Sequence, residues 1–180
     1  METRVRVRDD DVLVASSTYK SVFNRFVRIH EIIVANNGVH VPAILCNSIM
    51  EFPDCIDFVR HETSRRRMIP ELHGWNHINY DTFSEKELED DLCQCIAWFE
   101  DNLWVKPSIF YPPWGSNSPL LQEVAARHGL VLVDCSNMIS PTQVVNNPGL
   151  YGACTELAIH WWHKKDRRNL EQALKILGRK

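Results

Sequence analysis

Strand-like and helix-like segments alternate along this chain of 180 residues, which limits the folds it can adopt. Short apolar runs predict β-strands, and apolar residues at helical spacing predict helices between them. The expected strands cover residues 5–11, 39–46, 68–72, 108–110, 130–133, 142–145 and 156–159, and the expected helices cover 18–36, 50–65, 84–99, 118–128 and 170–177. This order favours an α/β fold with parallel strands. Because an eight-fold barrel needs roughly 200 residues, a smaller or incomplete barrel is expected.

The composition is that of one globular domain, which we expect to span residues 1–180. Apolar residues make up 44% and charged residues 24% of the chain, which excludes a disordered or collagen-like protein. The net charge is −3, so a nucleic-acid partner is not expected. No apolar run reaches the roughly 20 residues of a membrane span, and the N-terminus lacks the apolar core of a signal peptide. The expectation is a cytoplasmic protein without a membrane partner.

The chain contains 6 cysteines, which raises the question of disulfides or a thiolate metal site. They lack paired zinc-type spacing, and without an export signal buried free thiols are expected. Cys93 and Cys95 form the only close pair. On a helix their side chains diverge by about 200°, which does not suit a shared metal ion.

Residues able to carry chemistry fall at the C-terminal ends of the predicted strands. They are Asp10 and Asp11, His73, Asp134 and His160. In a parallel barrel or sheet these strand ends gather on one face, where binding and catalytic sites are built. We therefore expect a functional site at this face.

His73 and His77 are four residues apart, a spacing that lets two imidazoles converge on one zinc-like ion. Such a spacing also arises by chance, so two polar residues in a surface turn are the alternative. Asp9, Asp10 and Asp11 are adjacent carboxylates, which repel one another unless a cation offsets them. One of them can complete a mixed His/Asp metal site, and a neighbour can take a proton from water. Strand alternation puts Asp11 in the inward, apolar row, with Asp10 beside it.

His160 follows a short apolar strand and is either a core residue or a general acid. Its position at the strand end favours the general acid, because the ordinary pKa of histidine lies near neutrality. Asp134, at another strand end, can orient it. The alternative for Asp134 is an ordinary loop residue.

Taken in order, these segments resemble the polysaccharide deacetylase family, also called the NodB homology domain or carbohydrate esterase family 4. Residues 8–12 (Arg-Asp-Asp-Asp-Val) resemble its Asp-Asp motif, and residues 73–77 (His-Gly-Trp-Asn-His) are similar to its His-x-x-x-His turn. Residues 110–115 (Phe-Tyr-Pro-Pro-Trp-Gly) resemble its Arg-Pro-Pro-Tyr-Gly loop, and residues 157–160 (Leu-Ala-Ile-His) its final strand end. The resemblance spans about residues 4–161.

This resemblance implies an incomplete, distorted (β/α)7 barrel of the NodB type. It implies one divalent metal ion, zinc or otherwise cobalt, nickel or manganese, held by Asp11, His73 and His77. Asp10 would be the general base that activates a metal-bound water, and His160 the general acid that protonates the leaving amine. The usual reaction in the family removes an acetyl group from an N-acetylated sugar.

Four aromatic residues are candidates for substrate contacts: Trp75, Tyr111, Trp114 and Trp161. By the resemblance, the backbone N–H near Trp114 would hold the developing oxyanion. Tryptophan rings suit stacking on a sugar or on a flat heterocycle. Packing in the barrel core is the alternative for Trp75 and Trp161.

The sequence departs from the family pattern in two places. The third aspartate leaves Asp9/Asp10 open as an alternative to Asp10/Asp11. Tyr111 stands where the family has an arginine that pairs with the base, so Arg8 or another cation would have to replace it.

The expected function is a metal-dependent deacetylase acting on a small-molecule or oligosaccharide substrate. Two alternatives stay open. One is a non-catalytic relic of the fold that binds a sugar or a partner, and the other is a hydrolase of cyclic amides or ureides.

Overall fold

All strands of the protein form one parallel sheet in the described part of the chain. The computed structural model describes residues 4–12, 19–133, 138–148, 156–160 and 163–178. The strand order is β5-β4-β3-β2-β1-β6, and every pair is parallel. The strands are β1 Arg6–Val12, β2 Val39–Leu45, β3 Glu71–Gly74, β4 Ile109–Phe110, β5 Val131–Leu132 and β6 Glu156–His160. This six-stranded half-barrel confirms the predicted incomplete (β/α) barrel.

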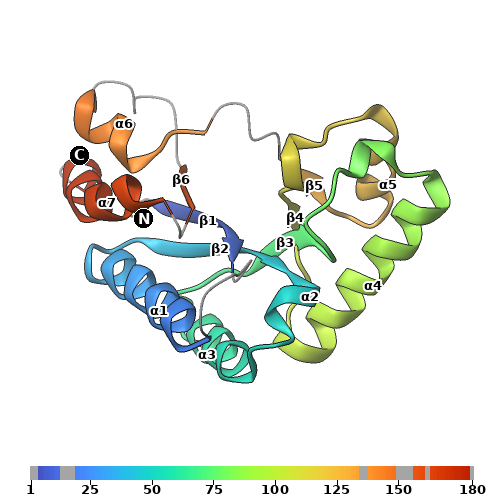
Figure 1. Cartoon of the computed structure of the whole chain (residues 1–180), viewed down its shortest axis with the longest axis horizontal. Helices are drawn as coiled ribbons and strands as arrows, with labels where there is room; N and C mark the ends of the chain where they lie inside the picture. The colour runs from blue at the N-terminus through green and yellow to red at the C-terminus, as the bar shows by residue number, and fades with distance from the viewer. Residues whose placement is uncertain (1–3, 13–18, 134–137, 149–155, 161–162, 179–180) are drawn as a thin grey trace.

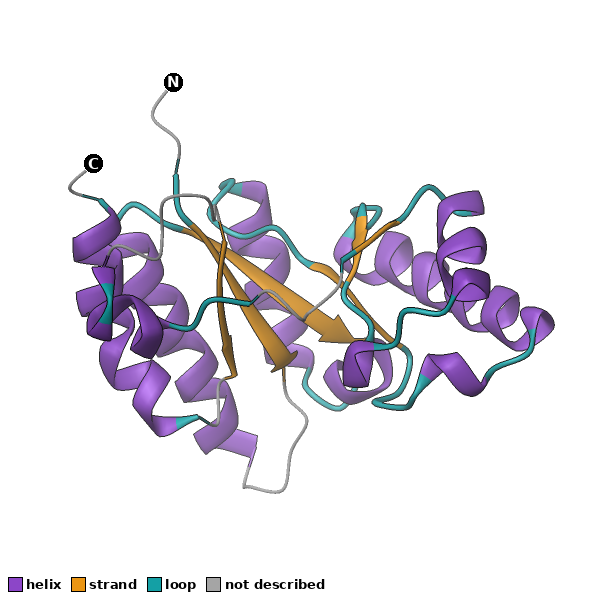
Figure 2. Cartoon of the chain, turned by 90° about the horizontal axis from the view of Figure 1, so that it is seen from above, coloured by secondary structure: helices purple, strands orange, loops and turns teal. Residues whose placement is uncertain are grey.

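Helices connect the strands and cover the sheet. They are α1 Tyr19–Ala35, α2 Cys46–Ile49, α3 Pro53–Ser64, α4 Glu85–Leu103, α5 Pro119–Arg127, α6 Pro141–Asn146 and α7 Lys164–Leu177, with short 3-10 turns η1 Tyr80–Thr82 and η2 Pro113–Gly115. Figure 1 shows α1 and α3 below β1 and β2, α6 and α7 beside β6, and α4 and α5 at the opposite end of the sheet. Seen from above in Figure 2, the strands run between helices on both sides.

Local sequence signals explain the long helices. In α1, residues at helical spacing are buried at Val22, Phe26 and Ile33, so one face of the helix packs on the sheet. In α4, the hydroxyl of Ser84 accepts from the N–H of Glu87, and the Glu87 carboxylate accepts from the N–H of Ser84. This capping box satisfies two backbone donors at the start of the helix.

Two predicted elements differ from the structure. Residues 142–145, expected as a strand, lie in α6, because Ser140 and Gln143 form a second capping box and Pro141 suits the first helical turn. The expected helix over 50–65 is present as α3 but begins only at Pro53, because proline suits the first helical turn.

The cysteines behave largely as predicted. Of the described cysteines, which are all free, Cys46, Cys55 and Cys95 are buried and Cys93 is exposed. The divergent burial of Cys93 and Cys95 agrees with the expected separation of neighbouring side chains on a helix. Cys135 and Cys154 lie outside the described residues. Within the described part of the chain, no helix is both long and apolar enough to cross a membrane.

A buried carboxylate joins β3 to the segment that enters β4. Glu71 is only 2% exposed. It accepts hydrogen bonds of 2.8 Å from the backbone N–H and the hydroxyl of Ser108 and from the N–H of Ile109. Because β3 and β4 pair at a single position, Leu72 with Phe110, these bonds supplement a short ladder.

We expect Glu71→Ala to lower the free energy of unfolding by about 3 kcal/mol or more, because it leaves buried donors without an acceptor. Urea denaturation would measure the change. The matched control is Glu51→Ala at an exposed position, for which we expect a change within about 0.5 kcal/mol. Equal effects of the two substitutions would show that Glu71 does not hold the strands together.

Candidate active site

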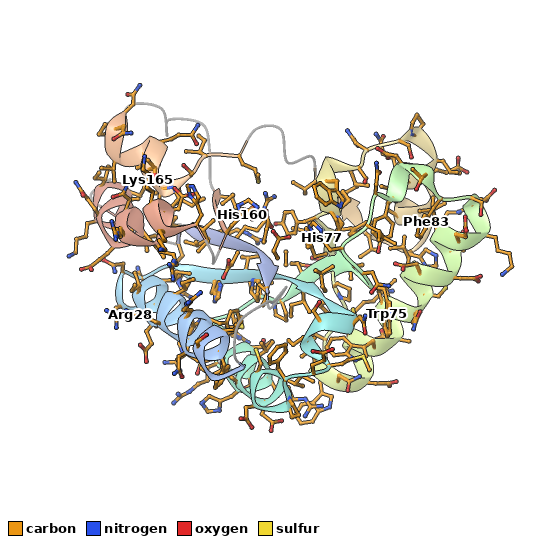
Figure 3. All side chains as sticks on the ribbon, in the orientation of Figure 1. Arg28, Trp75, His77, Phe83, His160 and Lys165 are labelled. Carbon is orange, nitrogen blue, oxygen red and sulfur yellow. The ribbon has the colours of Figure 1, made fainter. Side chains whose placement is uncertain are left out.

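A cavity of about 430 Å³ opens at the C-terminal ends of the strands. Its lining residues are Asp10, Asp11, His73, His77, Pro112, Trp114, Gly115, Met138 and His160. They come from the ends of β1, β3 and β6 and from the segments that follow β3, β4 and β5. In Figure 3, His77 and His160 lie near one another above the centre of the sheet. Polar side chains at the ends of the strands therefore meet at one cavity, as predicted.

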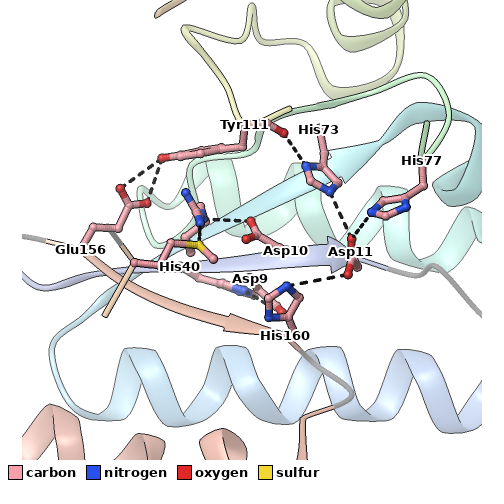
Figure 4. A network of polar contacts seen from close by, with 11 residues as sticks. Asp9, Asp10, Asp11, His40, His73, His77, Tyr111, Glu156 and His160 are labelled. Carbon is pink, nitrogen blue, oxygen red and sulfur yellow. Dashed lines mark hydrogen bonds and ion pairs between the residues drawn. The ribbon is translucent and has the colours of Figure 1, made fainter. Parts of the chain in front are cut away.

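One oxygen of Asp11 faces two imidazoles. Oδ1 lies 3.1 Å from Nε2 of His73 and 2.8 Å from Nε2 of His77. One ligand atom from each of the three residues lies within 4.8 Å of the other two. Figure 4 shows Asp11 between these rings and His160. Two imidazoles and a carboxylate at such separations form a set of donors that zinc-like ions use in sites that keep an open position.

Asp11 reaches the cavity because the backbone leaves the regular strand at this residue. Its φ is 56°, and the register between β1 and β2 shifts between Asp9 and Val12. This bulge turns Asp11, so that Asp10 and Asp11 line the same cavity although simple alternation places them on opposite faces. Asp9 is fully buried elsewhere, with Oδ2 3.7 Å from Nε2 of His40. The structure thus brings Asp10 and Asp11, not Asp9, to the cavity.

The contacts of His73 test whether a metal ion suits this set. Its Nδ1 donates to the carbonyl oxygen of Tyr111 at 2.5 Å, so in the neutral ring Nε2 carries a lone pair that faces the Asp11 carboxylate. Nε2 of His73 and Oδ1 of Asp11 are then both acceptors, and they cannot lie this close together unless a proton or a cation is between them. A metal ion meets this need, and the bond to a backbone carbonyl is the usual outer support of a ligating histidine.

The charge state of Asp11 agrees with a role as a ligand. Burial alone raises the pKa of Asp11, but when the imidazoles are protonated, the hydrogen bond from His73 and the charges of His73, His77 and His160 outweigh it and lower the pKa to about 2. The carboxylate is therefore ionised at neutral pH, the form that binds a cation.

A glycine and a tyrosine fix the turn that carries the two histidines. Gly74 has a φ of 106°, and a Cβ atom there would lie 2.2 Å from Oη of Tyr80. The same hydroxyl accepts from the N–H of Trp75 at 3.0 Å and donates to Asp91 at 2.8 Å. The chain can pass this closely to Tyr80 only because residue 74 has no side chain.

A buried arginine accompanies Asp10. Arg8 Nε lies 2.9 Å from Asp10 Oδ1, and the two side chains are 2% and 5% exposed. The guanidinium carbon lies 4.5 Å from the ring centroid of Tyr111, and Arg8 also contacts the sulfur of Met138. The Tyr111 hydroxyl donates to Glu156 at 2.8 Å. A cation from β1 thus lies beside Asp10 and against the ring of Tyr111. Figure 4 shows the bond between Tyr111 and Glu156.

His160 faces Asp11 from β6, on the side away from His73 and His77 (Figure 4). Its Nε2 lies 3.9 Å from Oδ2 of Asp11, and its backbone pairs with Asp10 in the parallel ladder. Its side chain is 32% exposed, so it is accessible to a substrate. Asp134, the predicted partner of His160, lies outside the described residues.

The four aromatic candidates separate into different environments. Trp114 lines the cavity and is 73% exposed, with its ring centroid 5.0 Å from that of His77. Trp75 is not among the lining residues and packs against the hydrophobic core, near α2 in Figure 3. Tyr111 is fully buried, so it supports Arg8 and His73 rather than reaching the cavity. Trp161 lies outside the described residues.

Sequence reasoning did not identify Met138 and Glu156 as parts of the site. Met138 lies in a polar, irregular segment, and Glu156 begins a strand 45 residues after Tyr111, to which it is hydrogen-bonded. Neither residue belongs to a motif with metal or catalytic spacing, so only the folded chain reveals their positions.

Comparisons with known proteins agree with this geometry. Residues 57–133 match the family model for polysaccharide deacetylase. Chitin deacetylase 1 of Cryptococcus neoformans is 28% identical over 75 residues, which cover 42% of this chain and 16% of that protein. The resemblance to the NodB or carbohydrate esterase 4 family is therefore confirmed.

Solved structures share the fold at low sequence identity. A family 4 carbohydrate esterase from Streptomyces lividans, solved with acetate, has a TM-score of 0.74 and 15% identity, over 98% of this chain and 88% of that chain. A CE4 family pseudoenzyme from Bacillus anthracis has a TM-score of 0.71 and 16% identity, over 98% of this chain and 61% of that chain. At these identities the likeness shows a shared fold, which occurs both in an esterase and in a pseudoenzyme.

We expect Gly74→Ala to destabilise the protein by about 3 kcal/mol, because the new methyl group collides with Tyr80 at a backbone angle that alanine tolerates poorly. Thermal unfolding would measure the loss. Gly129→Ala is the matched control, because Gly129 has a φ of 75° but nothing within 4 Å of an added Cβ. This control should cost only about 1 kcal/mol, and an equal loss in both variants would contradict the role of the contact.

Proposed function

We propose that this chain, in which the polysaccharide deacetylase family is recognised, is a metal-dependent hydrolase that removes an acetyl group from an N-acetylated sugar or a related amide. We further propose that residues 1–180 form a single catalytic domain. The observation that carries the proposal is the presence of two carboxylates and three imidazoles around one cavity, Asp10, Asp11, His73, His77 and His160.

The proposed metal ligands are Asp11, His73 and His77, whose donor atoms lie within 4.8 Å of one another. Family members generally use a divalent metal, and zinc is the ion we propose here, with cobalt, nickel or manganese as alternatives. When bound, such an ion polarises a carbonyl group and makes a water molecule more acidic. His73 is held for this role by its bond to the Tyr111 carbonyl oxygen.

Asp10 and His160 are the proposed proton carriers. Asp10 takes a proton from the attacking water, and the water oxygen forms a bond to the acetyl carbonyl carbon. The carbon–nitrogen bond then breaks while His160 gives a proton to the departing nitrogen. The products are acetate and a free amine. Because Asp10 and His160 are paired positions of neighbouring strands, the base and the acid can serve one reacting group.

The volume of the cavity and an exposed aromatic ring beside it support a small or oligomeric sugar as the substrate. A volume of about 430 Å³ suits one or two sugar units within the range of ordinary ligand pockets. The exposed ring of Trp114 lies at the cavity and offers a face on which a sugar ring can stack. We propose that its backbone N–H faces the developing oxyanion.

A non-catalytic relic is the second candidate. The similarity to a pseudoenzyme and the tyrosine at position 111 favour it. The buried Arg8–Asp10 pair weighs against it, because Arg8, on the same strand as Asp10, supplies a cation beside the proposed base. A hydrolase of cyclic amides would use the same groups, so a substrate panel of chitooligosaccharides, nucleotide sugars and cyclic imides separates it from a deacetylase.

We expect the purified protein loaded with zinc or cobalt to release acetate from an N-acetylated sugar. Asp10→Asn and His160→Ala should each lower kcat by about 100-fold or more, since each removes one proton-transfer group. Acetate release and metal content by elemental analysis are the measurements.

Asp9→Asn is the control, because Asp9 lies beside His40 and not at the cavity. A folded Asp9→Asn variant should retain most of the turnover. If the metal-loaded chain hydrolyses no member of the substrate panel, or if Asp10→Asn and His160→Ala leave turnover unchanged, the proposal of a hydrolase is wrong.

Arg8 is proposed to position Asp10 through the buried ion pair between them. We expect Arg8→Gln to lower kcat/KM about tenfold, because glutamine cannot replace the charge-assisted hydrogen bond that holds the Asp10 carboxylate. Arg8→Lys should restore part of the loss, because lysine supplies the cation again. A purely structural role predicts equal losses of activity in the two variants, so the absence of rescue by lysine contradicts the proposal.

A further inference from the structure

A second cluster of metal-binding side chains lies away from the cavity, between α4 and α5. Glu89 and Cys93 belong to α4, and His128 follows the end of α5. One ligand atom from each lies within 4.8 Å of the other two. We propose that these three residues bind a second divalent ion of the zinc class, independently of the centre at Asp11.

The backbone holds all three donors in place. Glu89 and Cys93 are four residues apart on α4, so their side chains lie on the same face of the helix. The N–H of His128 donates to the carbonyl oxygens of Val124 and Ala125 at 3.3 and 3.1 Å, and Gly129 then turns the chain with a φ of 75°. An ion here would join two helices without a change in the course of the chain.

The shortest distance between the three donor atoms is below those expected in a zinc site, and the limit on all three lies above them. Nε2 of His128 lies 2.5 Å from Oε2 of Glu89, while the limit for all three donors is 4.8 Å. In a tetrahedral site with bonds of about 2.0–2.3 Å, neighbouring donors are roughly 3.3–3.8 Å apart. Small rotations of the side chains therefore bring the imidazole, carboxylate and thiolate around one ion.

The charges around the cluster favour a cation. Arg127 Nη2 lies 2.7 Å from Glu85 Oε1 and 2.8 Å from Glu89 Oε1, and its Nη1 lies 3.9 Å from Glu123 Oε1. Three carboxylates thus surround one guanidinium, which leaves excess negative charge. Arg127 occupies Oε1 of Glu89, whereas Oε2 points to His128 and is in position to act as the ligand.

The donor chemistry distinguishes this cluster from the cavity. A thiolate, an imidazole and a carboxylate are a mixed set that zinc and cobalt accept, with a fourth position left to water. Among the described cysteines, Cys93 is the exposed one, so an ion can reach it from solvent. The ligands proposed at the cavity contain no sulfur, so a sulfur-to-metal signal reports on the second cluster.

The test is a cobalt(II) titration of metal-stripped protein carrying His77→Ala, which removes one ligand of the first centre. We expect one equivalent of cobalt with a sulfur-to-cobalt charge-transfer band, which zinc then abolishes by displacing the cobalt. Adding Cys93→Ser should remove the band and weaken zinc binding by about tenfold or more. Adding Glu85→Gln instead should preserve the band, because Glu85 contacts Arg127 without reaching the donors.

Absence of the band in His77→Ala, or its persistence after Cys93→Ser, overturns the proposal. If His77→Ala fails to fold, as judged by circular dichroism, the comparison is made on the otherwise unchanged chain. There Cys93→Ser should reduce bound zinc by one equivalent, and an unchanged stoichiometry overturns the proposal. None of these measurements depends on deacetylase activity, so this inference and the proposed function succeed or fail separately.

Discussion

The carboxylate of Asp11 faces the imidazoles of His73, His77 and His160, and this convergence is the constraint on which the site depends. The four residues come from β1, the β3 end and turn, and β6, which are far apart in sequence. Strand order brings them together, because β1 lies between β2 and β6 and all strands end on the same side. A bulge at one residue then turns Asp11 toward the rings. The site therefore depends both on the strand order of the fold and on the bulge at Asp11.

A second constraint is the charge buried beside the proposed metal centre. Asp10 and Arg8 are almost fully buried, and two such groups are costly to remove from water unless each is well paired. The Tyr111 ring lies against the guanidinium, and its hydroxyl is tied to Glu156. Tyr111 therefore does more than fill the place of the family's arginine. It supports a cation that arrives from β1, while its carbonyl oxygen holds His73.

Much of this arrangement was predictable because it follows from periodic patterns and strand ends. The order of strands and helices and the gathering of polar residues at the strand ends required only apolar periodicity. The choice of His73 and His77 as a pair over a surface turn came from the resemblance to a known family. Alternation favoured the pair Asp10/Asp11 over Asp9/Asp10, but it cannot predict the bulge that brings Asp10 and Asp11 to the same cavity, because a bulge breaks the two-residue period. The helix at Pro141–Asn146 was missed although Ser140 and Gln143 carried a capping signal. The contacts of Glu156 and Met138 are non-local, and no pattern in the sequence encodes them.

The cost of the site bears on whether it is active or a relic. Adjacent carboxylates, a buried ion pair and imidazoles crowded around one oxygen contribute little to stability, and apolar replacements of similar volume often stabilise a protein. The backbone at Asp11 adds strain, because a left-handed φ of 56° is unfavourable for a residue with a side chain. A chain that needs only to fold has no use for this combination. The proposed function accounts for its presence, because a hydrolase of the proposed kind needs a cation, a base and an acid at one cavity.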